Sequence, residues 1–323
     1  MAEPILEVKN LTKAFGSVRA LSDISLTVRR SETLGVVGES GCGKTTLGRC
    51  IVRGVEASAG EVVYHPEGGE AYDLLRLKKK ELRTRRKDLQ MIFQDPYSSL
   101  DPRMTVFDII AEPLRAHYRL ERPEIERKVF EVAEWTGLTP QYLRRYPHAF
   151  SGGQRQRVGI ARALIALPKL IVCDEAVSAL DVSIQAQIIN LLKDLQDRLQ
   201  LSYIFISHAL SVVEYISDRV AVMYLGKIVE LANTEALFAR PRHPYTEALL
   251  SAAPKPDPDA QTDRIILQGE VPNPAHPPSG CAFHPRCRFA RPVCTRTDPP
   301  LQKITDEHAC ACHFANDLTL CGM

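Results

Sequence analysis

The stretch LGVVGESGCGKTTLGRCIV, residues 34–52, decides the fold. A short apolar run leads into a glycine-rich turn, and a helical pattern of apolar residues follows from Leu47. Residues 38–45 fit the pattern G-x-x-x-x-G-K-[ST], with the strand before and the helix after that this pattern requires. The glycines let successive backbone N–H groups turn toward phosphate oxygens, and the helix N-terminus adds partial positive charge. The stretch therefore predicts a phosphate-binding loop.

Two residues of this loop have specific expected roles. Lys44 should reach the β- and γ-phosphates of a nucleotide, and the Thr45 hydroxyl should ligate Mg²⁺. A glycine-rich turn that binds nothing is the structural alternative, which the flanking strand and helix disfavour. The loop residues expected to contact ATP are Gly38, Glu39, Ser40, Gly41, Cys42, Gly43, Lys44, Thr45 and Thr46.

An acidic motif complements the loop. In LIVCDE, residues 170–175, four apolar residues predict a buried strand. Ligands collect at the carboxyl ends of parallel strands, so this strand should deliver Asp174 to the sheet edge that carries the phosphate loop. Asp174 would hold Mg²⁺ through its water shell, and Glu175 would polarise the attacking water. The two motifs together indicate a P-loop NTPase.

The remaining patterns predict an α/β fold. Residues 5–15 and 20–28 alternate apolar and polar side chains, which is typical of two half-buried antiparallel strands. Strands and helices then alternate, which indicates a parallel sheet covered on both faces. Residues 105–145 are helical in pattern and interrupted by prolines, which predicts an inserted α-helical lobe. The strongly charged residues 76–88 are expected to form a solvated helix face, and contact with phospholipid headgroups is the alternative.

The composition is that of an ordinary globular protein. Lys and Arg number 41 and Asp and Glu number 39, so the formal net charge is +2 and nothing demands a nucleic-acid partner. The N-terminus has no basic segment leading into an apolar run, and no stretch approaches the roughly 20 apolar residues that cross a bilayer. We therefore expect a cytoplasmic protein whose membrane role comes from its partners.

A second candidate phosphate site lies in FSGGQRQRV, residues 150–158. A serine and two glycines precede a helix, so its N-terminus can face phosphate without a lysine. A whole helical lobe separates this motif from the first loop, and a head-to-tail dimer brings two such motifs onto one nucleotide more easily than a single chain does. With these motifs the chain resembles the ATP-binding subunit of an ABC transporter.

The resemblance implies roles for residues at matching positions. Gln94, in MIFQDP, is similar to the Q-loop glutamine, which joins the Mg²⁺ shell with Thr45 and Asp174. His208, at the end of YIFISH, is similar to the switch histidine that senses the γ-phosphate. Read singly, these two residues are a surface amide and a strand-end histidine. The resemblance assigns catalysis to Glu175, His208, Gln94 and Lys44 as a set.

Three further positions follow from the resemblance. Phe15 lies where the family places an aromatic ring that stacks on adenine, although it reads equally as a core residue when taken alone. The signature motif, which contacts the γ-phosphate held by the opposite subunit, is Ser151, Gly152, Gly153 and Gln154. The D-loop, which runs along the dimer interface, is Ser178, Ala179, Leu180 and Asp181.

The chain departs from the family pattern at two positions. Ala176 follows Glu175 where proline is usual, and Ala209 follows His208 where aspartate is common. Neither change removes a catalytic group. Because proline restricts the backbone, Ala176 is expected to loosen the loop that aims Glu175. We still expect a competent hydrolytic site.

Sequence beyond the nucleotide motifs resembles one branch of the family. Residues 93–114, 175–192 and above all PRHPYTEALLSAAP at 241–254 are similar to the ATPase subunits of oligopeptide/dipeptide-type importers. That branch also imports nickel chelates, opines and oligosaccharides, so the cargo stays open. ABC-type ATPases of DNA repair or translation are the rival class, but their long coiled coils and paired heads are absent from this sequence.

The resemblance also implies partners. Two different ATPase subunits often pair beneath two transmembrane permease subunits in this branch, and an extracytoplasmic substrate-binding protein delivers the cargo. ATP binding would close the ATPase dimer and hydrolysis would reopen it. The expected location is the cytoplasmic face of the inner (plasma) membrane, as a peripheral protein. A regulatory module without turnover is disfavoured, because the catalytic residues are intact.

Six of the nine cysteines crowd the end of the chain. Cys281, Cys287 and Cys294 are spaced C-x5-C-x6-C, and Cys312 or Cys310 offers a fourth thiol. The positions resemble a cysteine-rich tail that binds a [4Fe-4S] cluster in some members of the branch, and four thiolates also suit Zn²⁺. Reduced cysteines that pack a small lobe are the structural alternative, and His284, His308 or His313 could orient the lobe or replace one thiolate.

The expected domains follow from these patterns. Seven prolines between residues 251 and 280 argue against regular structure there. We therefore expect an ATP-binding domain over residues 1–250 with its helical lobe at about 100–165, a proline-rich linker over 251–280 and a Cys-rich extension over 281–323.

Overall fold

The computed structural model describes residues 3–95, 97–253 and 264–323. Contacts divide the chain into two compact units. The first unit comprises Met1–Leu6, Val28–Glu32 and Val63–Ile206, and the second comprises Glu7–Thr27, Thr33–Val62 and Ser207–Met323. Part of the expected linker, with three of its prolines (residues 254, 256 and 258), lies outside the described residues.

The first unit contains three parallel strands, β6 (Leu89–Ile92), β7 (Leu170–Asp174) and β8 (Ser202–Ile206). β7 lies between the other two, and all five of its residues are buried. A strand covered on both faces must be apolar throughout, which explains the run LIVC. The pairing of Asp174 with Ile206 places this carboxylate at the carboxyl end of the parallel strands.

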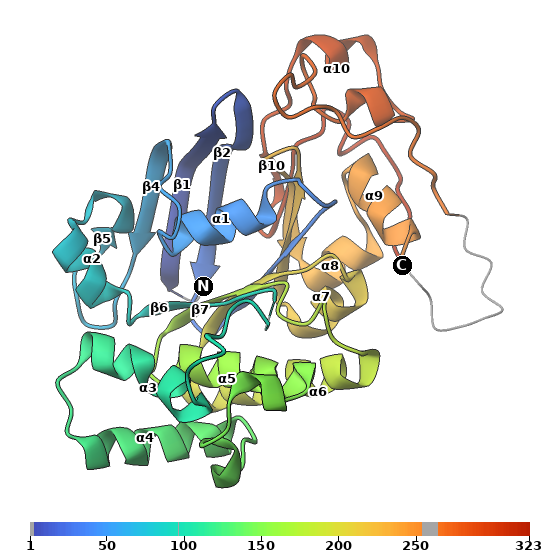
Figure 1. Ribbon diagram of the computed structural model, residues 1–323. Helices are drawn as coiled ribbons and strands as arrows, with labels where there is room; N and C mark the ends of the chain where they lie inside the picture. Colours follow the sequence, from blue (N-terminus) through green and yellow to red (C-terminus); the bar gives the residue numbers. More distant parts are fainter. Residues whose placement is uncertain (1–2, 96, 254–263) are drawn as a thin grey trace. The chain divides into compact units, whose positions relative to one another are not determined.

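The helices of the first unit include the expected lobe, and Figure 1 draws α3 (Val106–His117), α4 (Arg122–Trp135) and α5 (Gly152–Leu164) in green. These three helices pack against one another, and α5 also packs against α6 (Val182–Leu199). The Thr105 hydroxyl begins α3 by accepting a bond from the Asp108 N–H at 3.2 Å. The inserted helical lobe is confirmed.

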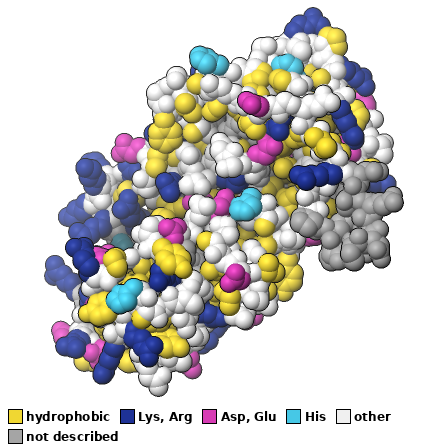
Figure 2. Space-filling view, turned by 45° about the vertical axis from the view of Figure 1, so that its right-hand side comes forward, with side chains coloured by type: hydrophobic (Ala, Val, Ile, Leu, Met, Phe, Trp, Pro, Cys, Tyr) yellow, Lys and Arg dark blue, Asp and Glu magenta, His cyan; other side chains and the backbone are white. Residues whose placement is uncertain are grey.

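The shorter elements of the first unit lie before and between these helices. They are β5 (Tyr72–Asp73), η1 (Leu74–Arg76), α2 (Lys79–Arg85), η2 (Pro140–Tyr142) and η3 (Pro147–Ala149). α2 carries much of the basic segment and buries Leu82 while its basic side chains are exposed. Figure 2 shows Lys and Arg side chains gathered on the side where Figure 1 draws α2.

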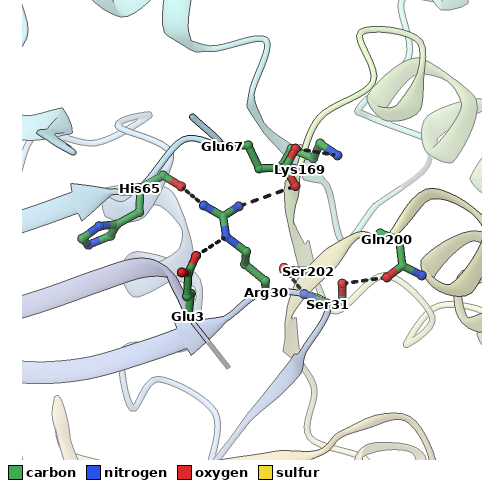
Figure 3. A network of polar contacts seen from close by, with 8 residues as sticks. All are labelled: Glu3, Arg30, Ser31, His65, Glu67, Lys169, Gln200 and Ser202. Carbon is green, nitrogen blue, oxygen red and sulfur yellow. Dashed lines mark hydrogen bonds and ion pairs between the residues drawn. The ribbon is translucent and has the colours of Figure 1, made fainter. Parts of the chain in front are cut away.

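A polar network ties distant segments of the first unit together (Figure 3). The Arg30 guanidinium donates to the His65 carbonyl at 2.7 Å and lies 3.8 Å from the Glu3 carboxylate. The Ser31 N–H donates to the Ser202 hydroxyl at 2.9 Å. Because its ion pairs are partly exposed, the network adds little to stability, about 0–1 kcal/mol for each pair.

The second unit holds two sets of neighbouring strands. In the first set β1 (Pro4–Phe15) lies between β2 (Val18–Arg29) and β4 (Ala59–Tyr64). Only two residues separate β1 from β2, so the two strands form an antiparallel hairpin. In the second set β3 (Thr33–Val37) runs parallel to β9 (Arg219–Tyr224), and β9 pairs antiparallel with β10 (Lys227–Asn233). The expected antiparallel part of the fold is confirmed.

The Cys-rich extension continues the sheet of the second unit. Strand β12 (His308–Cys310) pairs antiparallel with β10 and with β11 (Gln302–Thr305). Glu230 of β10 pairs with Cys310 of β12 in this register. The extension is therefore built onto the same sheet as the strand that precedes the phosphate loop.

The helices of the second unit are short. They are α1 (Lys44–Ile51), α7 (Leu210–Ile216), α8 (Thr234–Ala239), α9 (Pro244–Ser251), η4 (His284–Arg286) and α10 (Pro292–Arg296). The described part of the expected linker, residues 264–280, contains no helix or strand. No helix within the described ranges is long and apolar enough to cross a membrane.

Candidate nucleotide site

The phosphate-binding loop connects β3 to α1 in the second unit. Gly38 has φ +152, and a Cβ there would lie 2.2 Å from the carbonyl oxygen of Met223. Only glycine fits this position, because a side chain would enter the backbone of β9. The loop packs against β9 at Gly38, which explains why the pattern needs glycine at its first position.

Lys44 begins α1 and folds back over the loop. Its side chain is 5% exposed, and its Nζ donates to the carbonyl oxygens of Gly38 at 2.8 Å and Glu39 at 2.9 Å. The loop thus holds a buried ammonium at a helix N-terminus, where an anion is favoured. Burial raises the pKa of the neighbouring Cys42 thiol, so this cysteine stays protonated beside the lysine.

Phe15 lies at the end of β1 with a largely accessible ring. Its exposed fraction is 49%, and the Lys13 ammonium lies 4.6 Å from the ring centroid. A core residue would be buried, so the structural reading of Phe15 as core is wrong. An exposed aromatic face is what stacking on adenine requires.

The first unit brings Gln94 and Glu175 together. The Gln94 side-chain amide donates to the Glu175 carboxylate at 2.8 Å, although 81 residues separate the two. Glu175 has φ +46, and its N–H donates to the carbonyl of Ile206 at 3.0 Å. Both the hydroxyl and the N–H of Ser178 donate to the Glu175 carbonyl, at 3.0 and 3.1 Å. These bonds hold the turn at Ala176 without a proline.

Asp174 and His208 both follow the carboxyl ends of strands. Asp174 is the last residue of β7 and is 1% exposed. A carboxylate buried to this degree needs a partner or a cation, and it has a contact within the protein. His208 begins the segment after β8 and is exposed, while the Ala209 N–H donates to the Ser207 hydroxyl at 3.0 Å. The first unit therefore carries Gln94, Asp174 and Glu175, and the second carries the phosphate loop and His208.

The signature residues form the start of α5. The Ser151 hydroxyl accepts from the Gln154 N–H at 3.4 Å, and the Gln154 amide oxygen accepts from the Ser151 N–H at 3.1 Å. This reciprocal capping box leaves the helix N-terminus well formed. A Cβ on Gly152 would lie 3.4 Å from Leu180 Cδ2, so the signature and the D-loop of the same chain are neighbours.

Four cysteines of the extension converge on one small cavity. Cys281, Cys287, Cys294 and Cys312 line it together with aromatic and histidine side chains, whereas Cys310 does not. Burial raises the pKa of Cys281 and of Cys287 to about 11 each. Among the described residues, no group of three or more His, Cys, Asp or Glu side chains is arranged to hold a metal ion. All nine cysteines are free.

Contacts between the extension and the rest of the second unit were missed by sequence reasoning. Arg286 pairs with Glu39 of the phosphate loop, and Arg288 pairs with the buried Glu247 at 2.8 Å. His308 Nε2 lies 2.7 Å from the carboxylate of Glu230, which is fully buried. The arginines of HPRCR were the only signal in the sequence, and that signal was read as part of a cysteine spacing.

Comparison with known proteins agrees with this geometry. The family model described as "ABC transporter" matches residues 21–178, and the model "Oligopeptide/dipeptide transporter, C-terminal region" matches residues 229–294. The chain is 51% identical to "Probable peptide ABC transporter ATP-binding protein y4tS" of Sinorhizobium fredii, with 97% of this chain and 90% of that protein covered. It is 52% identical to "Oligopeptide transport ATP-binding protein OppF" of Salmonella typhimurium, with 92% and 88% covered.

Solved structures show the same similarity. A dimeric post-hydrolysis state of the ATP-binding cassette MJ0796 with ADP and Pi has a TM-score of 0.63 and 28% identity, over 71% of this chain and 98% of that one. Structure of cbiO1 from Clostridium perfringens, part of the transporter complex cbiONQ, has a TM-score of 0.65 and 26% identity, over 73% and 91%. The chain therefore belongs to the ATP-binding subunits of ABC transporters, in the oligopeptide/dipeptide branch of that family.

Proposed function

We propose that the chain binds and hydrolyses ATP to drive a transporter that imports oligopeptides or dipeptides. The observation that carries this proposal is the loop at residues 38–45, which holds the buried Lys44 ammonium against its own carbonyls at a helix N-terminus. The names of the relatives, which refer to peptide import and oligopeptide transport, support the cargo. Nickel chelates, opines and oligosaccharides are the alternative cargoes.

In this proposal ATP replaces contacts that the loop makes with itself. The β- and γ-phosphates take the place of the Gly38 and Glu39 carbonyls at the Lys44 ammonium, and backbone N–H groups of residues 38–46 donate to the phosphate oxygens. The adenine stacks on Phe15, whose ring is half exposed. The half-buried loop and the exposed ring supply the two ends of a nucleotide site.

The donor set fits Mg²⁺, which prefers carboxylate and hydroxyl oxygens. The Thr45 hydroxyl and the Asp174 carboxylate would hold it, with the Gln94 amide oxygen as a further ligand. Mg²⁺, when bound, neutralises charge that develops on the transferred phosphate. Glu175 polarises the attacking water, and the bond from Gln94 restrains the Glu175 carboxylate before ATP arrives. His208 contacts the γ-phosphate.

We propose that the signature residues serve a nucleotide on a second ATPase subunit. The capping box at Ser151 leaves the first N–H groups of α5 directed out of the helix N-terminus, where a phosphate is favoured. The MJ0796 cassette in the comparison is a dimer. The D-loop would lie along the interface, and a different ATPase chain is the expected partner.

The remaining partners follow from an importer. They are two transmembrane permease subunits and an extracytoplasmic substrate-binding protein, with this chain on the cytoplasmic face of the inner membrane. An ABC-type ATPase of DNA repair or translation is the distant alternative. The match of residues 229–294 to the C-terminal region of oligopeptide/dipeptide transporters favours the importer over that alternative.

For the extension we propose a metal bound by Cys281, Cys287, Cys294 and Cys312, as a [4Fe-4S] cluster or as Zn²⁺. The shared cavity of the four thiols supports it, but the thiols must move closer and lose their protons, because the described side chains do not form a ready metal site. Metal and acid-labile sulfide content of protein purified without oxygen tests this. Absence of iron, sulfide and zinc would return these cysteines to the packed-thiol reading.

The transport proposal is tested in the assembled transporter reconstituted in lipid vesicles. Wild type should hydrolyse ATP and accumulate peptide, while Lys44→Ala should lose ATP binding and both activities. Glu81→Gln, on the exposed helix α2, should retain both activities and serves as the control. Peptide uptake that survives Lys44→Ala with an intact partner site silenced in parallel would contradict the proposal.

A further inference from the structure

We propose that Arg286 is a positioning residue for ATP binding, because it holds the phosphate-binding loop through Glu39. The inference rests on the proposed role of that loop in binding ATP. It makes the Cys-rich extension part of the nucleotide site, a role that the phosphate-loop pattern and the cysteine spacing do not suggest.

The contact between Arg286 and Glu39 is a two-pronged ion pair. Arg286 Nη1 lies 2.7 Å from Glu39 Oε2, and Nη2 lies 3.1 Å from Glu39 Oε1. The Arg286 side chain is 8% exposed and that of Glu39 is 27% exposed. Two parallel charge-assisted bonds fix orientation as well as distance, and partial burial protects them from screening.

Glu39 is held at its other polar atoms as well. Its N–H donates to the Tyr245 hydroxyl at 2.8 Å, and its carbonyl accepts from Lys44 Nζ at 2.9 Å. Since Lys44 must exchange that carbonyl for phosphate, the position of Glu39 bears directly on ATP binding. After the exchange, the bonds to Arg286 and Tyr245 are the ones that keep this part of the loop in place.

The base of this arrangement is rigid. Tyr245 is fully buried, and its ring centroid lies 4.7 Å from that of Tyr224 and 5.4 Å from that of Phe283. Phe283 belongs to the extension, and its carbonyl accepts from the Arg286 N–H at 3.0 Å. The aromatic cluster therefore fixes both the Tyr245 hydroxyl and the short helix η4 that ends at Arg286.

Charge gives a second reason for the pair. The loop is built to attract phosphate through N–H groups and Lys44, and a lone carboxylate on Glu39 would repel the same phosphates. Arg286 neutralises that carboxylate. Removing only the arginine should therefore harm ATP binding more than removing both members of the pair.

Docking of the extension does not depend on this pair. Arg288 pairs with Glu247 at 2.8 Å, and His308 pairs with Glu230 at 2.7 Å, and neither contact includes a residue of the phosphate loop. β12 is also joined to β10 by strand pairing. Arg288→Gln thus removes an equivalent cation from a buried carboxylate of the same unit and is a matched control for Arg286→Gln.

The test measures the ATP dissociation constant of the full chain, and kcat and KM of ATP hydrolysis in the complete transporter. Arg286→Gln should weaken ATP binding about tenfold, which corresponds to about 1.4 kcal/mol, and raise KM more than it lowers kcat. Arg288→Gln should stay within about twofold of wild type. The double variant Arg286→Gln/Glu39→Gln should bind ATP more tightly than Arg286→Gln alone.

Two further measurements keep the result decisive. The thermal midpoint without nucleotide reports folding, and Arg286→Lys, which keeps the charge but loses the two-pronged geometry, should give an intermediate ATP affinity. Equal losses of affinity in Arg286→Gln and Arg288→Gln, or no loss in Arg286→Gln, would overturn the proposal. If Arg286→Gln does not fold, wild-type affinity in Arg286→Lys and in the double variant would overturn it equally. Retained ATP binding in Lys44→Ala would instead refute the proposed role of the loop itself.

Discussion

Substituting alanine at two glycines of the phosphate loop separates backbone strain from steric exclusion. Gly38 and Gly41 both have positive φ, +152 and +79. A Cβ on Gly41 meets no atom within 4 Å, whereas a Cβ on Gly38 would lie 2.2 Å from the Met223 carbonyl oxygen and 2.8 Å from Cys42 Sγ. The two positions share the conformational problem but differ in space.

The expected costs follow from this difference. Gly41→Ala should cost about 1–2 kcal/mol, which is the usual penalty for a left-handed alanine. Gly38→Ala adds a clash with backbone, and Met223 cannot retreat freely because it pairs with Ile228 in the β9–β10 ladder. We expect a cost of at least about 3 kcal/mol at Gly38, which sums strain of about 1–3 kcal/mol with overpacking of similar size.

The assay is thermal unfolding of the two variants without nucleotide, followed by ATP binding. At roughly 2 °C for each kcal/mol, Gly41→Ala should lower the midpoint by about 2–4 °C and Gly38→Ala by at least about 6 °C. ATP binding should fall more than about tenfold in Gly38→Ala, because the loop must open to relieve the clash. Equal midpoints and equal ATP affinities in the two variants would refute the reasoning that β9 excludes a side chain at Gly38.

Three other predictions concern catalysis, base recognition and pH. Glu175→Gln should lower kcat by about 10²- to 10⁴-fold while ATP still binds, which single-turnover hydrolysis and nucleotide binding distinguish; unchanged kcat would remove Glu175 from the mechanism. Phe15→Ala should cost about 1–3 kcal/mol of ATP affinity, whereas Phe15→Tyr should retain it, as competition between ATP and a triphosphate without a base would show. Burial lowers the pKa of His243 to about 4, so the unfolded chain binds a proton that the folded chain rejects and stability falls as the pH drops from 6.5 toward 4. The loss should reach about 2 kcal/mol at pH 5, and His243→Asn, which can still accept from the Tyr245 N–H, should remove it from the pH profile of unfolding.

Local pattern accounts for much of what could be predicted. The glycines and lysine of residues 38–45 act through their own backbone and the helix that they begin, so their spacing alone announces the loop. The run LIVC predicts a strand buried on both faces, and β7 is buried throughout. The helical lobe between Thr105 and Arg145 was also readable, since its capping and periodicity are features of neighbouring residues.

Pairings between distant side chains were not readable in this way. Gln94 was predicted to face Mg²⁺, and the structure joins its amide to the Glu175 carboxylate across 81 residues. The spacing of the cysteines did not distinguish Cys310 from Cys312, whereas the fold places Cys312 at the cavity and Cys310 on strand β12. Such choices depend on which face of each element meets its neighbour, and no periodicity encodes that.

The sequence by itself determined the phosphate loop, the acidic strand end, the α/β alternation and the family, because each of these is written in contiguous residues whose chemistry is local. Only the tertiary structure decided that β12 continues the sheet at β10 and that Arg286 lies on Glu39, 247 residues away. Strand pairing and buried ion pairs are satisfied by whichever partner the folded chain brings within about 3 Å, and that partner is chosen by the packing of whole elements.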